Sequence, residues 1–273
     1  MMLHLDHTLG CGQVFRWHRE GSLWKGVVDG RTVVLEQDGD SVRVRKGMDE
    51  PAFGRYFRAD DDLERMIDEL GKDTVLRGYL ERYRGLRLVR QDPWECLASY
   101  VLATNANIPR IQKMIERVCS TFGTELDDGM FAFPDPGQML DGHERAGTCG
   151  LGYRCGRFIE LARLAYREEL DLEGMKGMGY EECVSKLIEL PGVGPKVADC
   201  VALFSLDHLE AFPVDVRMEK AMAELYGMSG SRQHIGRCSR EMFGRWAGYA
   251  QEYIYMGFGE KVIGTAGIRS RGP

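Results

Sequence analysis

The first part of the chain alternates short apolar segments with turn residues. Between residues 13 and 45 four segments are rich in Val, Phe and Trp: QVFRW, LWKGVV, RTVVLEQ and SVRVR. The pairs Asp29-Gly30 and Asp38-Gly39 separate the last three segments, and such pairs favour tight hairpin turns. Because β-branched and aromatic residues are enriched in strands, the pattern predicts a small antiparallel β-meander.

From about residue 60 onward, the apolar residues recur at helical spacing. One apolar stripe runs from Ile108 to Phe122 and ends at Gly123, a residue type that commonly follows a helix C-terminus. Asp92 and Pro93 begin another helix as an N-cap and a first-turn proline. Similar patterns predict further helices at about 135–141, 156–170, 180–190, 195–206, 214–226 and 243–257.

A small sheet followed by a long helical region indicates an α+β fold. We expect residues 1–90 to form a β-rich domain, with a twisted antiparallel sheet and short helices. We expect residues 91–273 to form an all-helical region in two helical subdomains. A chain of 273 residues is long enough to bury a sizeable core.

Composition limits the location of the protein and its cofactors. No apolar run approaches the roughly 18 residues that cross a membrane, and the start of the chain lacks a signal-peptide pattern. We therefore expect a cytoplasmic protein without a membrane partner. The net charge of −6 argues against broad binding of nucleic acids but allows a local basic surface. The eight cysteines form no CxxC pair, so we expect neither a metal nor another cofactor.

The segment ELPGVGPKVADC, from Glu189 to Cys200, predicts two helices joined by a tight glycine turn, which is a helix-hairpin-helix. The glycines let the backbone turn sharply and approach another molecule closely. Backbone N–H groups of Gly192, Val193 and Gly194 can then hold a phosphate at the start of the second helix. The alternative interpretation is an ordinary turn between two helices.

Lys196 lies in the first turn of the second helix, where the helix dipole disfavours a cation. We expect the dipole and burial to lower the pKa of Lys196 and so to favour the neutral, nucleophilic amine. The alternative is a lysine that contacts phosphate or solvent. Asp215 follows one helix and one loop later, and its carboxylate can stabilise an oxocarbenium ion. An N-cap is the alternative role for this residue.

These stretches resemble the helix-hairpin-helix DNA glycosylase superfamily and, within it, the 8-oxoguanine DNA glycosylase/AP lyase family. Four further segments resemble motifs of that family in the same order along the chain. They are GQVFRW at 12–17, TNANIPRI at 104–111, GLGYR at 150–154 and AGYAQEYIY at 247–255.

The resemblance implies a role for each matching residue of the pocket. Lys196 would attack C1′ of the damaged nucleotide and form a Schiff base, and Asp215 would orient and deprotonate the amine and stabilise the sugar's charge. The carbonyl of Gly12 would accept a hydrogen bond from N7–H, which normal guanine lacks. Gln251 would bind the Watson–Crick edge of the flipped base, while Cys200 and Tyr255 would cover its two faces.

The resemblance also implies how the protein would hold double-stranded DNA. Asn105, Arg110 and Arg154 would contact the orphaned cytosine, and Tyr153 would wedge into the base stack. Arg217 would join the hairpin in binding the DNA backbone. The implied enzyme is a monomer that needs no cofactor, excises 8-oxoguanine opposite cytosine and then nicks the strand by β-elimination. Such a base-excision enzyme would associate with the nucleoid if the protein is prokaryotic.

Three positions depart from the family pattern. Pro195 replaces a residue that is often small and polar, Arg217 stands where histidine is common, and Tyr255 stands where phenylalanine is common. These departures concern the approach of the lysine, a phosphate contact and the sandwich around the base.

Three other classes are less consistent with the sequence. Endonuclease III-like glycosylases usually carry four C-terminal cysteines, but only Cys238 follows Cys200 here. Alkylbase glycosylases lack the hairpin lysine. A non-catalytic helix-hairpin-helix module would not need Lys196 and Asp215 together.

Overall fold

The computed structural model describes the backbone of residues 1–268 and the side chains of residues 1–259. Its N-terminal part contains one sheet of four strands in the order β1-β2-β3-β4. All neighbouring strands are antiparallel, as predicted. The strands are β1 (His18–Glu20), β2 (Leu23–Val28), β3 (Arg31–Asp38) and β4 (Ser41–Lys46).

The prediction that QVFRW is a strand is wrong, because the first strand begins only at His18. The side chains of Gln13, Phe15 and Trp17 are all buried, and this segment packs as a loop beside the sheet. Trp17 Nε1 donates a hydrogen bond to Tyr56 Oη at 2.8 Å. Side-chain contacts therefore fix this segment, where pairing with a neighbouring strand was expected.

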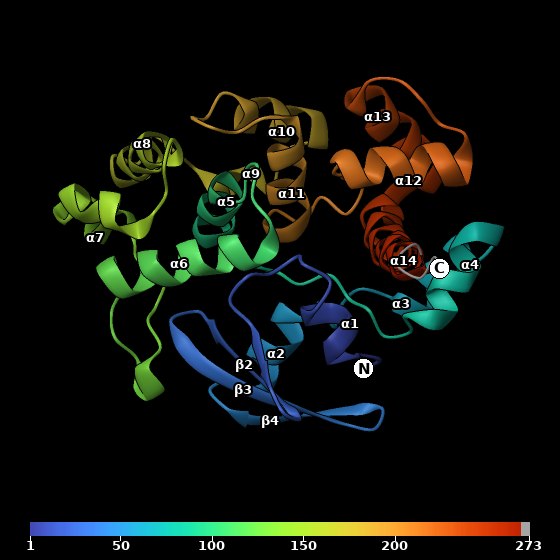
Figure 1. Cartoon of the computed structure of the whole chain (residues 1–273), viewed down its shortest axis with the longest axis horizontal. Coiled ribbons are helices and arrows are strands. Elements are labelled where there is room, and N and C mark those ends of the chain that lie inside the picture. Colours follow the sequence, from blue (N-terminus) through green and yellow to red (C-terminus); the bar gives the residue numbers. More distant parts are fainter. Residues whose placement is uncertain (269–273) are drawn as a thin grey trace, which may run out of the picture.

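Two short helices accompany the sheet, α1 (Leu5–Leu9) and α2 (Glu50–Tyr56). Figure 1 shows both helices between the sheet and the helical part of the molecule. Val33 and Leu35 of β3 are fully buried in the small core that the sheet forms with these helices. One face of the sheet is thus covered by the N-terminal part itself.

The remaining helices form the larger part of the molecule (Figure 1). They are α3 (Leu63–Leu70), α4 (Thr74–Arg82), α5 (Pro93–Leu102), α6 (Ile108–Phe122), α7 (Pro136–Asp141), α8 (Arg154–Tyr166), α9 (Leu172–Met175), α10 (Tyr180–Ile188), α11 (Pro195–Ser205), α12 (Val216–Tyr226), α13 (Arg232–Phe243) and α14 (Ala247–Ile268). A sheet followed by helices confirms the α+β prediction.

Helices α5 and α11 form the centre of the main core. They are buried along nearly their whole lengths and contact each other directly. The rings of Tyr100 and Phe204 stack between them at a centroid distance of 5.7 Å. Because α11 begins at Pro195, this packing fixes the position of the hairpin lysine that follows.

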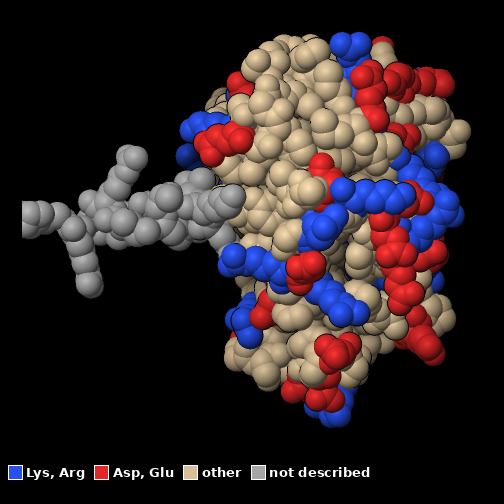
Figure 2. Space-filling model, turned by 90° about the vertical axis from the view of Figure 1, so that its right-hand side faces the viewer, with Lys and Arg blue, Asp and Glu red and all other residues tan. Residues whose placement is uncertain are grey.

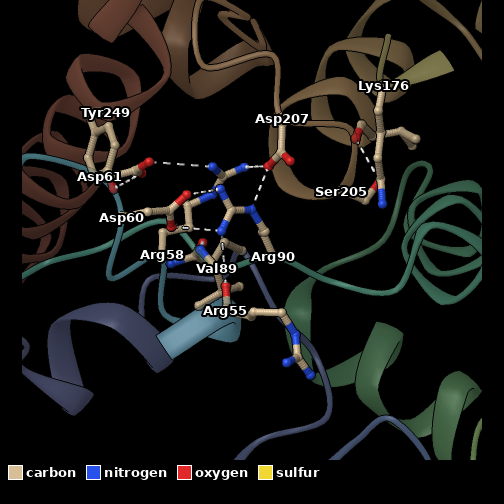
Figure 3. A network of polar contacts seen from close by, with 12 residues as sticks. Arg55, Arg58, Asp60, Asp61, Val89, Arg90, Lys176, Ser205, Asp207 and Tyr249 are labelled. Atoms are coloured by element: carbon tan, nitrogen blue, oxygen red, sulfur yellow. Dashed lines mark hydrogen bonds and ion pairs between the residues drawn. The ribbon is translucent and has the colours of Figure 1, made fainter. Parts of the chain in front are cut away.

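A partly buried ionic network joins the N-terminal part to the helical core (Figure 3). The Arg58 guanidinium is 1% exposed and pairs with Asp207, which follows α11. Arg90 donates from Nε to Asp207 and from Nη2 to Asp60, each at 2.8 Å. Asp61 pairs with Arg58 and accepts a hydrogen bond from a tyrosine of α14. Residues far apart in the sequence are therefore held together by shared carboxylates.

The face with α3, α4 and α12–α14 carries charges of both signs. Figure 2 shows Lys and Arg side chains interspersed with Asp and Glu side chains there. Glu69, for example, pairs with Arg65 at 2.7 Å and with Arg245 at 2.8 Å. No helix among the described residues is long and apolar enough to cross a membrane.

Candidate active site

The hairpin, the N-terminal loop and helix α14 meet at an open cavity of about 1190 Å³. The cavity brings together most of the predicted site residues from segments distant in the sequence. Its lining includes Gly12, Asn105, Gly192, Gly194, Lys196, Cys200, Asp215, Gln251 and Tyr255. A pocket of this size can take a small ligand such as a flipped nucleotide.

The hairpin turn has the geometry that its glycines permit. Gly192 has φ of 85°, and a Cβ atom there would lie 2.9 Å from the Arg157 side chain. Gly194 is the N-cap of α11 and supplies no side-chain cap, so the helix start is suited to an anion. Val193 differs from the prediction, because its N–H donates to the Leu190 carbonyl at 3.1 Å within the turn. Its side chain is buried.

Lys196 is partly buried in the cavity, and its Nζ lies 4.9 Å from the centre of the Tyr100 ring. Burial lowers the pKa of Lys196, but Cys200 and Asp215 raise it, and the net direction is upward. The predicted lowering is therefore wrong, because neighbouring groups outweigh desolvation. Lys196 is an ammonium group at neutral pH and needs a proton acceptor before it can act as a nucleophile.

Asp215 is both an N-cap and a member of the cavity lining. Its Oδ1 accepts a hydrogen bond from the Met218 backbone N–H at 2.9 Å, which caps α12. The alternative reading as a cap is thus correct but does not exclude a second role. The same carboxyl group raises the pKa of Lys196, so the two groups interact electrostatically.

Gly12 has φ of 99°, and a Cβ atom there would lie 3.0 Å from Ile108 Cδ1. The buried side chain of Gln13 fixes the adjacent backbone. Its Nε2 donates to the Arg87 carbonyl at 2.9 Å, and its Oε1 accepts from the Val89 N–H at 3.0 Å. Gln13 lies in the GQVFRW motif, but the motif alone predicts no role for it. It holds the Gly12 loop against the cavity.

Gln251 and Tyr255 of α14 line the cavity together with Cys200 of α11. Gln251 is 4% exposed, and its Oε1 has no hydrogen-bond partner among the described residues. The Arg217 guanidinium lies 4.4 Å from the centre of the Tyr255 ring. Two departures from the family pattern therefore contact each other. Arg217 supports the aromatic wall, where the sequence predicted only a backbone contact.

The residues predicted to fill the gap in the DNA lie at the rim. Tyr153 is 56% exposed, and Asn105 Nδ2 donates to Tyr153 Oη at 3.2 Å. Arg110 is exposed in the first turn of α6. Arg154 is only 2% exposed, and its Nε donates to the Thr104 carbonyl at 3.0 Å. Arg154 therefore lies behind Tyr153 and has to turn outward to reach a base.

Glu252 is a further cavity residue that the sequence analysis missed. It is 4% exposed, and burial raises its pKa to about 7. The motif AGYAQEYIY contains this residue, but no spacing indicates that its carboxyl group is buried. Among the described residues, no cluster of three His, Cys, Asp or Glu side chains could hold a metal ion.

Comparisons with known proteins show what the chain is similar to. Residues 1–97 match the family described as "8-oxoguanine DNA glycosylase, N-terminal domain". The N-glycosylase/DNA lyase OGG1 of Arabidopsis thaliana is 31% identical, with 93% of this chain and 77% of that protein covered. The probable N-glycosylase/DNA lyase of Methanothermobacter thermautotrophicus is 32% identical, with 82% and 81% covered.

Solved structures extend the similarity to the whole fold. The Clostridium acetobutylicum 8-oxoguanine glycosylase/lyase, in complex with dsDNA containing cytosine opposite to 8-oxoG, has a TM-score of 0.90. It is 32% identical, with 95% of this chain and 92% of that chain covered. A 3-methyladenine DNA-glycosylase from Archaeoglobus fulgidus, at 20% identity and a TM-score of 0.77, shares the fold.

Proposed function

Because the chain belongs to the family of 8-oxoguanine N-glycosylase/DNA lyases, we propose that it excises 8-oxoguanine opposite cytosine through Lys196. The observation that carries the proposal is one cavity lined by Gly12, Lys196, Asp215 and Gln251. We also propose that residues 1–90 and 91–273 act as two domains, with the cavity between them.

Recognition begins when the damaged nucleotide is flipped into the cavity. The Gly12 carbonyl accepts a hydrogen bond from N7–H, a donor that distinguishes 8-oxoguanine from guanine. The unpartnered Oε1 of Gln251 accepts from the Watson–Crick edge. Cys200 and Tyr255 lie on opposite faces of the base. The φ of 99° at Gly12 supports this assignment, because a side chain is disfavoured there.

The Lys196 amine and the Asp215 carboxylate carry out the excision step. Neutral Lys196 attacks C1′, the bond from C1′ to the base breaks, and the base leaves with the bonding electron pair. Asp215 stabilises the positive charge that develops on the sugar. The C1′–O4′ bond of the sugar ring then breaks, O4′ takes the proton that the bound amine loses, and a Schiff base forms. The Schiff base acidifies the hydrogens on C2′, so that loss of one proton expels the 3′ phosphate by β-elimination.

The DNA around the flipped nucleotide contacts the rim of the cavity. The turn at Gly192 and Gly194 and the start of α11 bind a phosphate. Exposed Tyr153 enters the stack, and Asn105 and Arg110 contact the cytosine that has lost its partner. Arg154 joins them after it leaves the Thr104 carbonyl.

Covalent trapping tests this function. The protein is incubated with duplex that contains 8-oxoguanine opposite cytosine, and borohydride reduces the Schiff base. We expect a trapped adduct with the native protein and none with Lys196→Gln. The matched control is Lys220→Gln, on the exposed side of α12, which should trap normally. Binding of the duplex without an adduct or a released base would refute the proposal. Equal excision opposite adenine would refute the cytosine preference.

A further inference from the structure

Glu252 of α14 is a buried carboxyl group in the cavity without an assigned task. It is 4% exposed, and its Oε2 has no hydrogen-bond partner among the described residues. Burial of a carboxylate with an unpaired oxygen destabilises the folded protein, because the charged group loses its hydration. Such a cost is often found where a group serves catalysis.

The titratable groups that interact with Glu252 come from several elements of the fold. They are Cys11 after α1, Tyr100 of α5, Lys196 and Cys200 of α11, Asp215 at the cap of α12, and Tyr255 of α14. Burial raises the pKa of Cys11, Tyr100, Cys200 and Tyr255, so all four are neutral at pH 7. Lys196 is thus the cation among these groups, and Glu252 and Asp215 are the acids.

The excision step needs a proton acceptor, because the net pKa shift of Lys196 keeps the amine protonated. Asp215 is poorly suited to this task. One of its oxygens already caps α12, and a protonated Asp215 could no longer stabilise the positive sugar. Burial raises the pKa of Glu252 to about 7, while its contacts with Cys11 and Lys196 lower it. A base with a pKa near the working pH is effective in proton transfer.

We propose that Glu252 accepts the proton that Lys196 loses, directly or through one water molecule, and passes it to the departing base. The inference rests on the proposed function. The Lys196 ammonium gives one proton to the Glu252 carboxylate, and the neutral amine forms the bond to C1′ as the bond to the base breaks. The base anion then takes the proton from Glu252, which returns to the carboxylate. Two carboxyl groups of one site thus have separate tasks.

The pH dependence of single-turnover excision tests this assignment. For the native protein we expect the rate to rise with pH through a midpoint near 7. For Glu252→Gln we expect a rate about 100-fold lower at pH 7, which continues to rise above pH 9 as the amine loses its proton to water. Glu252→Asp should keep the lower midpoint at a reduced rate. Glu241→Gln, an exposed change on α13, is the matched control and should behave as native.

A duplex with a preformed abasic site tests the effect of Glu252 on the Lys196 amine separately from any effect on the base. If Glu252 serves Lys196, Glu252→Gln also slows borohydride trapping on this duplex, where no base is present. Normal trapping there, with slow excision of 8-oxoguanine, would overturn the proposal in favour of base recognition. A slower rate with an unchanged pH profile would overturn it in favour of a packing role.

Failure of the proposed function gives a different pattern. In that case the native protein itself neither releases the base nor forms a trapped adduct. If native excision and trapping occur, and Glu252→Gln matches the native rate and midpoint, only the assignment of Glu252 fails. Thermal unfolding and duplex binding are measured for each variant. If Glu252→Gln folds poorly, the midpoint of the pH dependence of excision by Glu252→Asp tests the assignment in its place.

Discussion

Replacement of Glu252 by glutamine should stabilise the folded protein at neutral and alkaline pH. Glutamine has nearly the same shape as glutamic acid but cannot ionise. In the native protein the buried carboxyl group ionises as the pH rises, and the folded state then carries a poorly solvated charge. The variant avoids this cost, although it is expected to lose activity, as stabilised active-site variants often do.

The size of this gain in stability follows from the pKa of Glu252, which burial raises from an ordinary value of 4.5 to about 7. The folded state binds this proton more tightly than the unfolded state. The contribution is therefore fully present below pH 4.5 and is lost as the pH rises through 7. At 1.36 kcal/mol for each pKa unit, the loss amounts to about 3 kcal/mol. The variant should match the native free energy of unfolding near pH 4.5 and exceed it by about 3 kcal/mol at pH 8.

Urea unfolding at several values between pH 4.5 and pH 8 measures this difference, provided the urea dependence is the same for both proteins. Glu241→Gln removes an exposed carboxyl group and should show no such pH-dependent gain. A difference that stays constant with pH would show that the substitution changes packing alone. A variant less stable than the native protein at pH 8 would refute the reasoning, since burial would then not disfavour the charge.

Three further substitutions test the site and its support. Gly12→Ala places a side chain at φ of 99° and close to Ile108, so excision should fall at least tenfold and the thermal midpoint should fall by about 2–4 °C; unchanged excision would contradict the close approach. Asp215→Asn keeps a good N-cap but removes the charge, so excision should fall about 1000-fold at nearly native stability; a parallel loss of stability would indicate a cap alone. Asp207→Asn removes the charge of one partner of buried Arg58, while Asp61 remains. Because Asp207 is 40% exposed, the free energy of urea unfolding should fall by only about 1–2 kcal/mol, and no loss would show that the network does not stabilise the fold.

Local sequence signals predicted the helices that have clear caps and stripes. The helix expected at 195–206 is found at Pro195–Ser205, because a glycine turn and a proline mark its start. Local sequence patterns did not predict α13 (Arg232–Phe243), because its buried positions include Gly236 and Ser239 in place of an apolar stripe. They also failed for residues 13–17, where long-range contacts decide the conformation.

The sequence also predicted only part of the candidate site. Lys196, Asp215, Gly12 and Gln251, which the motifs singled out, line one cavity in the structure, and their roles stay predictions. The sequence could not give the direction of the Lys196 pKa shift, because this depends on how closely other side chains pack around the amine. It could not indicate Glu252 either, since only the folded arrangement buries that carboxyl group.

The shared carboxylate of Asp207 has a consequence for the fidelity of repair. Gly12, which would distinguish the oxidised base, belongs to the N-terminal part, whereas Lys196 lies in the first turn of the helix that Asp207 follows. Arg58 and Arg90 tie that helix end to the N-terminal part. Under the proposed function, a loosened network would therefore let Lys196 react with the sugar before Gly12 has contacted the base. The first loss in such a protein would be selectivity against normal guanine, with the capacity to cut DNA preserved.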